Sequence, residues 1–277
     1  MTVLVVGSTS NLSKALQAWC TSHSIPTEIV PTEKLRYWSS ESNLLELKGF
    51  FSQTFELKKF TAVIYASGVT NPAVSQKTIE DLNFLFPFEI TKLLTSTQAK
   101  ILLPGAFMEK FPDYASKSTY LNSKLMLARA LEQIEGNWLN LRFNQWYGGV
   151  QIRNHLFLGA VIESIRLRVP FRMSDGLQLR EYHHIEDDIG VFFHPSISSM
   201  RGHLDVTHGQ SMKVRDVAFA LFSHFGLLDL LQIGRLPSAL EDNYELYTRF
   251  NPQLLGLSFR ETISGILDYT SSALENR

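Results

Sequence analysis

The feature that most constrains the fold of this chain is the alternation of short apolar runs with stretches of helical spacing. The runs occupy residues 2–6, a segment ending at Val30, and residues 60–67, 101–103 and 138–143. Between them, apolar residues recur at helical spacing, as they do in 12–20, 79–94 and 118–135. Buried strands joined by helix-length crossovers form a parallel sheet with helices on both faces. We therefore expect an α/β fold with a Rossmann-type doubly wound parallel sheet.

The regular rhythm covers residues 1–149 and loosens after Gly149. We expect a dinucleotide-binding Rossmann domain over 1–149, with a returning segment near 184–210, and a smaller lobe made mostly of residues 150–277. Ligands of such sheets bind at the carboxyl ends of the strands. Functional residues should therefore lie just after Val6, Ser67, Leu103 and Phe143.

Composition excludes some classes of protein. The formal net charge is −1, so no basic field is present to attract nucleic acid or an anionic membrane. Cys20 is the single cysteine, which precludes an internal disulfide and fits a reducing compartment. No apolar run reaches the length of a membrane span, and the first residues lack the features of a signal peptide. These observations predict a cytoplasmic protein that binds neither nucleic acid nor membranes.

The first candidate site is the turn from Gly7 to Ser13, between the first strand and the first helix. Backbone N–H groups and the helix dipole at such a turn favour a pyrophosphate. An ordinary strand–turn–helix with a polar cap would give the same residues. The predicted cofactor-binding residues are Gly7, Thr9, Ser10, Asn11 and Leu12, together with Ala66, Ser67 and Gly68 after a later strand.

No acidic residue ends the second strand, where an acid would hold the ribose of NAD. Lys34 and Arg36 lie just beyond it. They can meet the additional phosphate of NADP, or they can be solvated surface charges. Both NAD and NADP remain candidate cofactors.

Tyr120 and Lys124 form the second candidate site. Residues four apart share one face of a helix, and this is the only Tyr–x–x–x–Lys spacing in the chain. A nearby ammonium favours the phenolate and so lowers the pKa of a tyrosine. Such a tyrosine can exchange a proton with a carbinol or ketone. We predict that both residues are catalytic and that Lys124 also contacts the cofactor.

Two further motifs follow along the chain. Asn144 and Gln145 end a strand with amide groups. Arg180 opens the segment 180–188, and its guanidinium suits a phosphate. The alternatives are two amides that serve a loop, and a metal site formed by His183, His184, Glu186 and Asp187. Neighbouring residues on a strand point to opposite faces, so we expect no metal there and a hydrogen-bonded structural histidine instead.

Taken in order, these motifs resemble the extended short-chain dehydrogenase/reductase family, in the NAD-dependent epimerase/dehydratase branch. Residues 141–148 resemble its R-x-x-N-x-Y-G pattern, and residues 180–187 resemble R-D-F-V-H-V-D-D. The resemblance implies an NAD(P)-dependent enzyme acting on a nucleotide-diphosphate sugar, for instance a reductase of a 4-keto-6-deoxy sugar in surface-polysaccharide biosynthesis. It implies that Asn144, Gln145 and Arg180 bind the substrate, that the C-terminal lobe is the substrate-binding lobe, and it is compatible with a homodimer.

The sequence departs from the family at two places. Ser10 and Ser13 stand where the family carries glycines, and Gly105 or Ala106 stands where it carries a substrate-binding Ser or Thr. Ser116, Ser118 and Thr119 are the nearest hydroxyls along the chain, and we expect Ser118 or Thr119 to cap the following helix. These departures leave a second hypothesis open, namely a non-catalytic sensor or scaffold that binds a dinucleotide.

Overall fold

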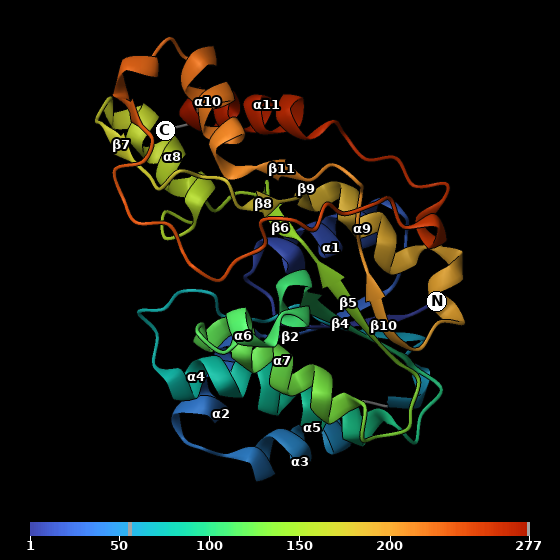
Figure 1. Ribbon diagram of the computed structural model, residues 1–277. Helices are drawn as coiled ribbons and strands as arrows, with labels where there is room; N and C mark the ends of the chain where they lie inside the picture. The colour runs from blue at the N-terminus through green and yellow to red at the C-terminus, as the bar shows by residue number, and fades with distance from the viewer. Residues whose placement is uncertain (55–56, 276–277) are drawn as a thin grey trace. The chain divides into compact units, whose positions relative to one another are not determined.

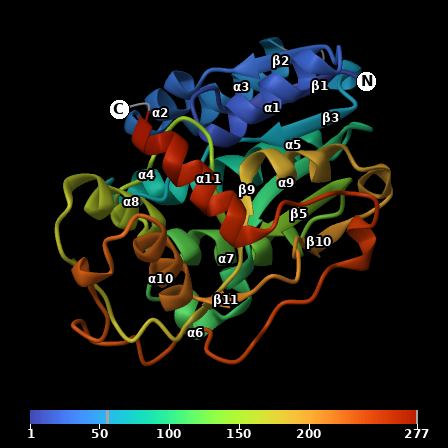
Figure 2. The ribbon, with the colours of Figure 1, turned by 90° about the horizontal axis from the view of Figure 1, so that it is seen from above.

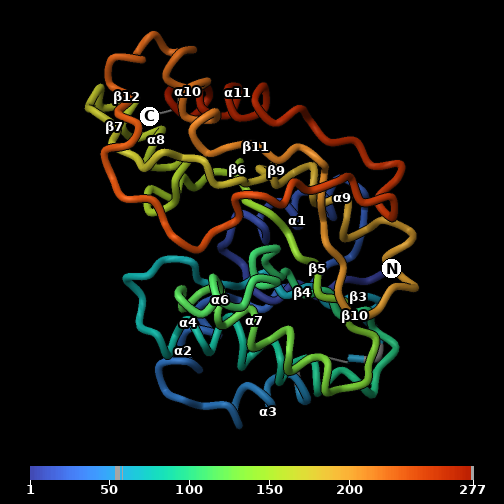
Figure 3. The backbone as a smooth tube through the Cα atoms, in the orientation of Figure 1, coloured from blue at the N-terminus to red at the C-terminus, as the bar shows by residue number. Residues whose placement is uncertain are grey.

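The computed structural model describes residues 1–54 and 57–275. The described residues divide into two compact units, the first within 1–143 and 189–206 and the second within 144–188 and 207–275. The course of the chain can be followed in Figure 3. Every helix in the described ranges is too short or too polar to cross a bilayer.

The first unit is built on a six-stranded parallel sheet with the strand order β10-β5-β4-β3-β1-β2 (Figure 1). Its strands are β1 (Val3–Val6), β2 (Thr27–Val30), β3 (Ala62–Tyr65), β4 (Lys100–Ala106), β5 (Trp138–Phe143) and β10 (Gly202–Asp205). The predicted α/β fold with a doubly wound parallel sheet is confirmed. The order reverses at β1, which has β2 on one side and β3 on the other, and open α/β sheets bind their ligands at the carboxyl ends of the strands at such a point.

Helices cover both faces of this sheet (Figures 1 and 2). They are α1 (Asn11–Ser22), α2 (Thr32–Ser40), α3 (Leu44–Thr54), η1 (Leu57–Lys59), α4 (Gln76–Glu80), the π-turn η2 (Asp81–Leu85), α5 (Phe86–Leu94), η3 (Phe107–Lys110), α6 (Pro112–Ala115), α7 (Thr119–Leu131), α9 (Ile185–Phe193) and η4 (Pro195–Ser198). α2, α3, α5 and α7 bury one face around Trp38, Phe51 and Phe86. On the other face Trp19 of α1 stacks on Phe193 of α9 with 6.0 Å between ring centroids.

Strand β4 is longer than the sequence suggested. The apolar run ends at Leu103, and Pro104 and Gly105 predicted a loop, yet β4 continues to Ala106. β3 pairs with β4 only as far as Leu102, and beyond that point β4 is bordered by β5 alone. Proline is tolerated there because a strand paired on one side does not need every N–H group for its ladders.

The second unit is a smaller α+β assembly with its own core. Its elements are β6 (Gln145–Tyr147), α8 (Phe157–Leu167), β7 (Phe171–Arg172), β8 (Leu179–Arg180), β9 (Tyr182–His184), β11 (Met212–Lys213), α10 (Val214–His224), η5 (Leu228–Leu230), β12 (Leu231–Gln232), η6 (Pro252–Leu254) and α11 (Thr262–Glu275). The strands form three two-stranded pairs, β11 with β8, β12 with β7, and β6 with β9. Val161, Phe222 and Ile266, from α8, α10 and α11, are fully buried together.

Candidate functional site

The loop after β1 lies at the carboxyl end of the sheet, where the strand order reverses. Gly7 has a φ of +108°, and a Cβ atom placed on it would lie 2.9 Å from Cβ of Ser67. Only glycine fits this combination of backbone conformation and close approach. The carboxyl ends of β1 and β3 therefore meet at Gly7 and Ser67, two of the predicted cofactor-binding residues.

The two serines at the family's glycine positions form hydrogen bonds with the backbone of the loop and of the segment after β3. Ser10 is the N-cap of α1, accepts from the N–H of Ser13 at 3.0 Å and donates its hydroxyl to the carbonyl of Ala66 at 2.6 Å. Ser13, fully buried, donates its hydroxyl to the carbonyl of Gly7 at 2.6 Å. The small hydroxyls face inward and hold the turn together, which is how this loop keeps a compact form with a single glycine.

The loop leads into the N-terminus of α1 at this end of the sheet. Helix geometry leaves the N–H of Leu12 without an intrahelical acceptor, and the helix dipole adds partial positive charge there. Thr32, which follows β2, accepts hydrogen bonds from the N–H groups of Ser8 at 2.8 Å and Thr9 at 3.3 Å. This hydroxyl ties the loop to the end of β2, where an acidic residue would bind ribose. The arrangement fits the pyrophosphate of a dinucleotide.

Asn83 holds Val69, the residue that directly follows the segment Ala66–Gly68. The Asn83 amide is fully buried in η2, accepts from the N–H of Val69 at 2.9 Å and donates to the carbonyl of the same residue at 2.8 Å. Single π-turns are frequent at functional sites. Here the π-turn aims Asn83 at the loop that follows β3. Gly68 itself is exposed, so its backbone can be approached by a ligand.

Tyr120 and Lys124 lie one turn apart on α7, as their spacing predicted. Lys124 is only 6% exposed, and its ammonium donates to the carbonyl of Pro104 in β4 at 2.7 Å. Burial lowers the pKa of Lys124 to about 8, and the charge of Glu109 partly opposes that shift. Tyr120 is half-buried near the start of the same helix.

The structure also locates the residues at the position of the missing hydroxyl. A Cβ atom on Gly105 would lie 2.5 Å from Oδ1 of Asn140, so a side chain there would collide with β5. Ala106 is 8% exposed and ends the strand. Ser118 is the N-cap of α7 and accepts from the N–H of Leu121, which confirms the predicted cap. The exposed hydroxyl of Ser116 donates to the carbonyl of Asp113 at 3.0 Å.

Lys34 and Arg36 are exposed on α2. The ammonium of Lys34 lies 4.5 Å from the centroid of the Phe50 ring, a cation–π contact that leaves it accessible to solvent. The choice between NAD and NADP stays a prediction.

In the second unit, Arg180 is held by a bidentate ion pair. Its Nη1 and Nη2 atoms lie 2.7 Å and 2.8 Å from the two carboxylate oxygens of Asp242, and the side chains are 12% and 5% exposed. Nη1 also donates to the carbonyl of Leu179. The guanidinium is therefore oriented by the protein, and any phosphate that approaches it must share it with Asp242.

Asn144 and Gln145 both form hydrogen bonds with the buried residue Glu181. The amide of Asn144 donates to Oε2 of Glu181 at 3.0 Å, and the backbone N–H of Gln145 donates to the carbonyl of Glu181 at 3.0 Å. Oε1 of Glu181 accepts from the N–H groups of His208 and Gln210, both at 2.8 Å. Glu181 thus joins the start of β6 to the segment that follows residue 207.

Asp188 is the second hub of this network. It is fully buried and accepts from Nδ1 of His183 at 2.9 Å, Nε2 of His208 at 2.8 Å and Nε1 of Trp146 at 2.6 Å. Burial opposes protonation of His183, but the charge and hydrogen bond of Asp188, with Glu181 beside it, outweigh burial and raise the pKa of His183 to about 9. The same contacts keep the pKa of Asp188 well below its usual value despite burial.

His183, Asp188 and His208 bring potential metal-ligand atoms within 4.8 Å of one another. The two imidazole rings are stacked, with centroids 3.4 Å apart and planes 7° from parallel. An imidazole nitrogen binds a metal in the plane of its ring, and one ion cannot lie in two parallel planes. This group therefore favours hydrogen bonding over metal binding, and it differs from the set that the sequence suggested.

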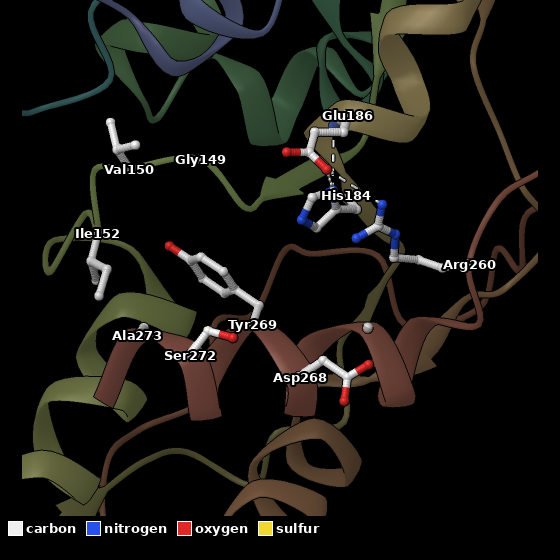
Figure 4. A pocket seen from close by; sticks show the side chains of 11 residues that line it. Gly149, Val150, Ile152, His184, Glu186, Arg260, Asp268, Tyr269, Ser272 and Ala273 are labelled. Carbon is white, nitrogen blue, oxygen red and sulfur yellow. Dashed lines mark hydrogen bonds and ion pairs between the residues drawn. The ribbon is translucent and has the colours of Figure 1, made fainter. Parts of the chain in front are cut away.

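A separate cavity of about 570 Å³ lies within the second unit (Figure 4). Tyr269, Ser272 and Asp268 of α11 line one side, and His184, Glu186 and Arg260 line the other. Arg260 is engaged by Asp187, with Nη2 and Oδ1 2.7 Å apart. Burial and the charge of Arg260 lower the pKa of His184. The predicted catalytic and substrate residues do not line this cavity.

Several residues of these sites escaped the sequence interpretation. Asn83, Glu109, Asp188, His208 and Asp242 act through partners 14 to 62 positions away in the chain. The available signal was a polar residue between apolar ones, as for Asn83 between Leu82 and Phe84, whereas Asp188 follows Glu186 and Asp187 and gave no such signal. That signal marks a buried polar group without identifying its partner.

Comparison with known proteins establishes the fold. No protein-family model matches the chain, and no curated protein matches it in sequence. MoeE5 in complex with UDP-glucose and NAD superposes with a TM-score of 0.74 at 18% identity, covering 99% of this chain and 100% of MoeE5. A dTDP-4-dehydrorhamnose reductase from Clostridium acetobutylicum gives 0.71 at 16%, covering 99% of both chains.

RMD from Pseudomonas aeruginosa, complexed with NADPH, gives a TM-score of 0.73 at 18% identity and covers all of both chains. The Rossmann-like fold with a doubly wound parallel sheet, expected from the sequence, is thereby confirmed for this chain. The similar structures are nucleotide-sugar enzymes or complexes with NAD or NADPH.

Proposed function

We propose that this chain is an NAD(P)-dependent oxidoreductase or epimerase acting on a nucleotide-diphosphate sugar, and first of all a reductase of a 4-keto-6-deoxy sugar in surface-polysaccharide biosynthesis. The observation that carries the proposal is the pair Tyr120 and Lys124 on α7, with the Lys124 ammonium buried on the end of β4. This pair lies in the unit whose sheet reverses between β1 and β3.

The first unit holds the cofactor in this proposal. The N-terminus of α1, with Gly7, Thr9, Ser10, Asn11 and Leu12, binds the pyrophosphate, and Ala66, Ser67 and Gly68 border the dinucleotide. NADPH, when bound, supplies the hydride. Lys124 holds the nicotinamide ribose and lowers the pKa of Tyr120, which donates the proton to the carbonyl oxygen of the sugar.

The second unit contributes the substrate-binding residues. Arg180, oriented by Asp242, pairs with the diphosphate, and Asn144 and Gln145 offer amide groups to the sugar. UDP-glucose in MoeE5 and the dTDP-sugar named for the Clostridium reductase support a nucleotide sugar as the ligand class.

The proposal is tested by two measurements on the purified chain. Millimolar NADPH or NADH should raise the melting temperature, because a ligand at 100 times its dissociation constant adds about 2.7 kcal/mol. Oxidation of NADPH should then depend on a nucleotide keto-sugar.

Arg180→Ala should weaken binding of the nucleotide sugar by about 1.5–3 kcal/mol and leave binding of the cofactor unaffected. Without any dinucleotide stabilisation the cofactor assignment fails, and equal loss of both ligands would make Arg180 structural.

A non-catalytic dinucleotide-binding protein is the second candidate. The observation that favours it is the end of β4, where Gly105 faces Asn140 and Ala106 carries no hydroxyl. Ser116 and Ser118 are engaged in local hydrogen bonds. Stabilisation by NADPH without turnover of any keto-sugar nucleotide would favour this candidate, and turnover would exclude it.

A further inference from the structure

Glu109, on the short helix η3 after β4, is a carboxylate buried to 1% exposure. Its Oε2 accepts from the N–H of Ala106 at 3.0 Å. Its Oε1 accepts from Nδ2 of Asn140 at 2.7 Å and from Nε of Arg142 at 2.8 Å. One carboxylate therefore connects the end of β4 to two residues of β5.

Lys124 contacts the same end of β4. Its ammonium donates to the carbonyl of Pro104, two residues before the N–H that Glu109 accepts. Residues 104–106 are thus held by a buried cation from α7 and a buried anion from η3. η3 also packs directly against α7.

We infer that Glu109 is a positioning residue, which keeps the Lys124 side chain charged and seated on the end of β4. This inference rests on the proposed function, in which Lys124 serves as an ammonium. A buried lysine without a compensating anion tends to become neutral. Neutral Lys124 would lose its attraction for the Tyr120 phenolate.

Several other charged groups on elements packed against α7 have partners of their own. Asp81 in η2 lies 2.5 Å from the ammonium of Lys77, and Glu89 in α5 lies 2.7 Å from that of Lys48. Lys110 on η3 pairs with Asp205, Lys100 begins β4 beside Asn137, and Asp113 lies on α6. The charge of Glu109 favours the protonated form of Lys124 and so opposes the effect of burial on its pKa.

Arg142 contacts two carboxylates, those of Glu109 and Asp205. It donates Nε to Glu109 and also lies 3.7 Å from Asp205 through Nη1. Asp205 pairs in turn with Lys110. Of the two carboxylates in this group, Glu109 is the one that reaches the strand end contacted by Lys124, through the N–H of Ala106.

The test is a titration of individual lysines in the full chain. Lysines labelled with ¹³C at Cε are followed by NMR from pH 6 to 11, and Lys124→Arg and Lys100→Arg identify the two signals. Wild-type Lys124 should titrate near pH 8. Glu109→Gln removes the charge and keeps the shape, and should make the proton of Lys124 about tenfold easier to lose.

Two controls separate charge from general disturbance. Lys100, whose pKa burial lowers to about 8, should keep its titration in Glu109→Gln. Glu132→Gln, at an acid 55% exposed at the end of α7, should leave Lys124 unchanged. If Glu109→Gln does not fold, Glu109→Asp takes its place. It withdraws the carboxylate by one methylene and should still lower the pKa of Lys124.

A Lys124 titration that is unchanged in both Glu109→Gln and Glu109→Asp would overturn the inference. These readouts need neither cofactor nor substrate. Failure of the proposed reductase therefore appears in the NADPH assay, while failure of this inference appears in the lysine spectra.

Discussion

Asp188→Asn is the sharpest test of the buried network in the second unit. The carboxylate is fully buried and accepts three hydrogen bonds, from His183, His208 and Trp146. Asparagine keeps the shape, removes the charge and leaves an imidazolium without its main partner. Breaking a buried ion pair by removing one partner typically costs about 3–5 kcal/mol.

The pKa of His183 gives an independent magnitude. A rise from 6.5 to about 9 corresponds to about 3 kcal/mol of stabilisation, at about 1.4 kcal/mol per pKa unit. Because the folded pKa is raised, this contribution is fully present below pH 6.5 and is lost as the pH rises through 9. The pKa of Asp188 is lowered, so its contribution is present above pH 3.8 and is lost as the pH falls below that value.

The assay is urea unfolding of wild type and Asp188→Asn at pH 6 and pH 9. At pH 6 the variant should be less stable by about 3 kcal/mol, and the difference should shrink markedly by pH 9. Taking the difference between the two proteins cancels other titrating groups, including Lys124. Exposed Asp229→Asn is the matched control and should change stability by less than about 0.5 kcal/mol.

An equal loss at both pH values would show that His183 does not change its protonation between pH 6 and pH 9. The ¹⁵N shifts of its imidazole would check this directly. A variant as stable as wild type at pH 6 would refute the reasoning as a whole.

Further predictions concern the first unit. Tyr120→Phe should lower NADPH-dependent turnover at least about a hundredfold with little change in the unfolding midpoint; full activity would exclude Tyr120 as the proton donor. Gly7→Ala should cost about 1–3 kcal/mol and weaken dinucleotide binding measured by calorimetry, because its backbone has a φ of +108° and the new methyl would meet Ser67. Gly105→Ser should destabilise the fold in a thermal melt because its Cβ would meet Asn140, whereas Ala106→Ser should be tolerated and should raise any low reductase activity. If Lys34→Ala and Arg36→Ala leave the ratio of NADP to NAD affinity unchanged, those residues do not read the additional phosphate.

The sequence by itself determined the elements whose signal is local. Hydrophobic period separates strands from helices, so β1, β5, α1 and α7 could be predicted within a few residues of their bounds. The cap at Ser118 and the spacing of Tyr120 and Lys124 are equally local, since one turn of helix sets both. The turn at Gly7 was predicted from its place between a strand and a helix.

Only the tertiary structure decided what these elements hold in place. The continuation of β4 through Pro104 depends on where β3 stops, and α2, α3 and α11 have patterns too weak to predict without the core that they pack against. The partners of Lys124, Arg180 and His208 lie 20, 62 and 20 residues away, so no local period reports them. Burial makes these contacts obligatory, because a charged group removed from water must find its partner wherever the fold brings one.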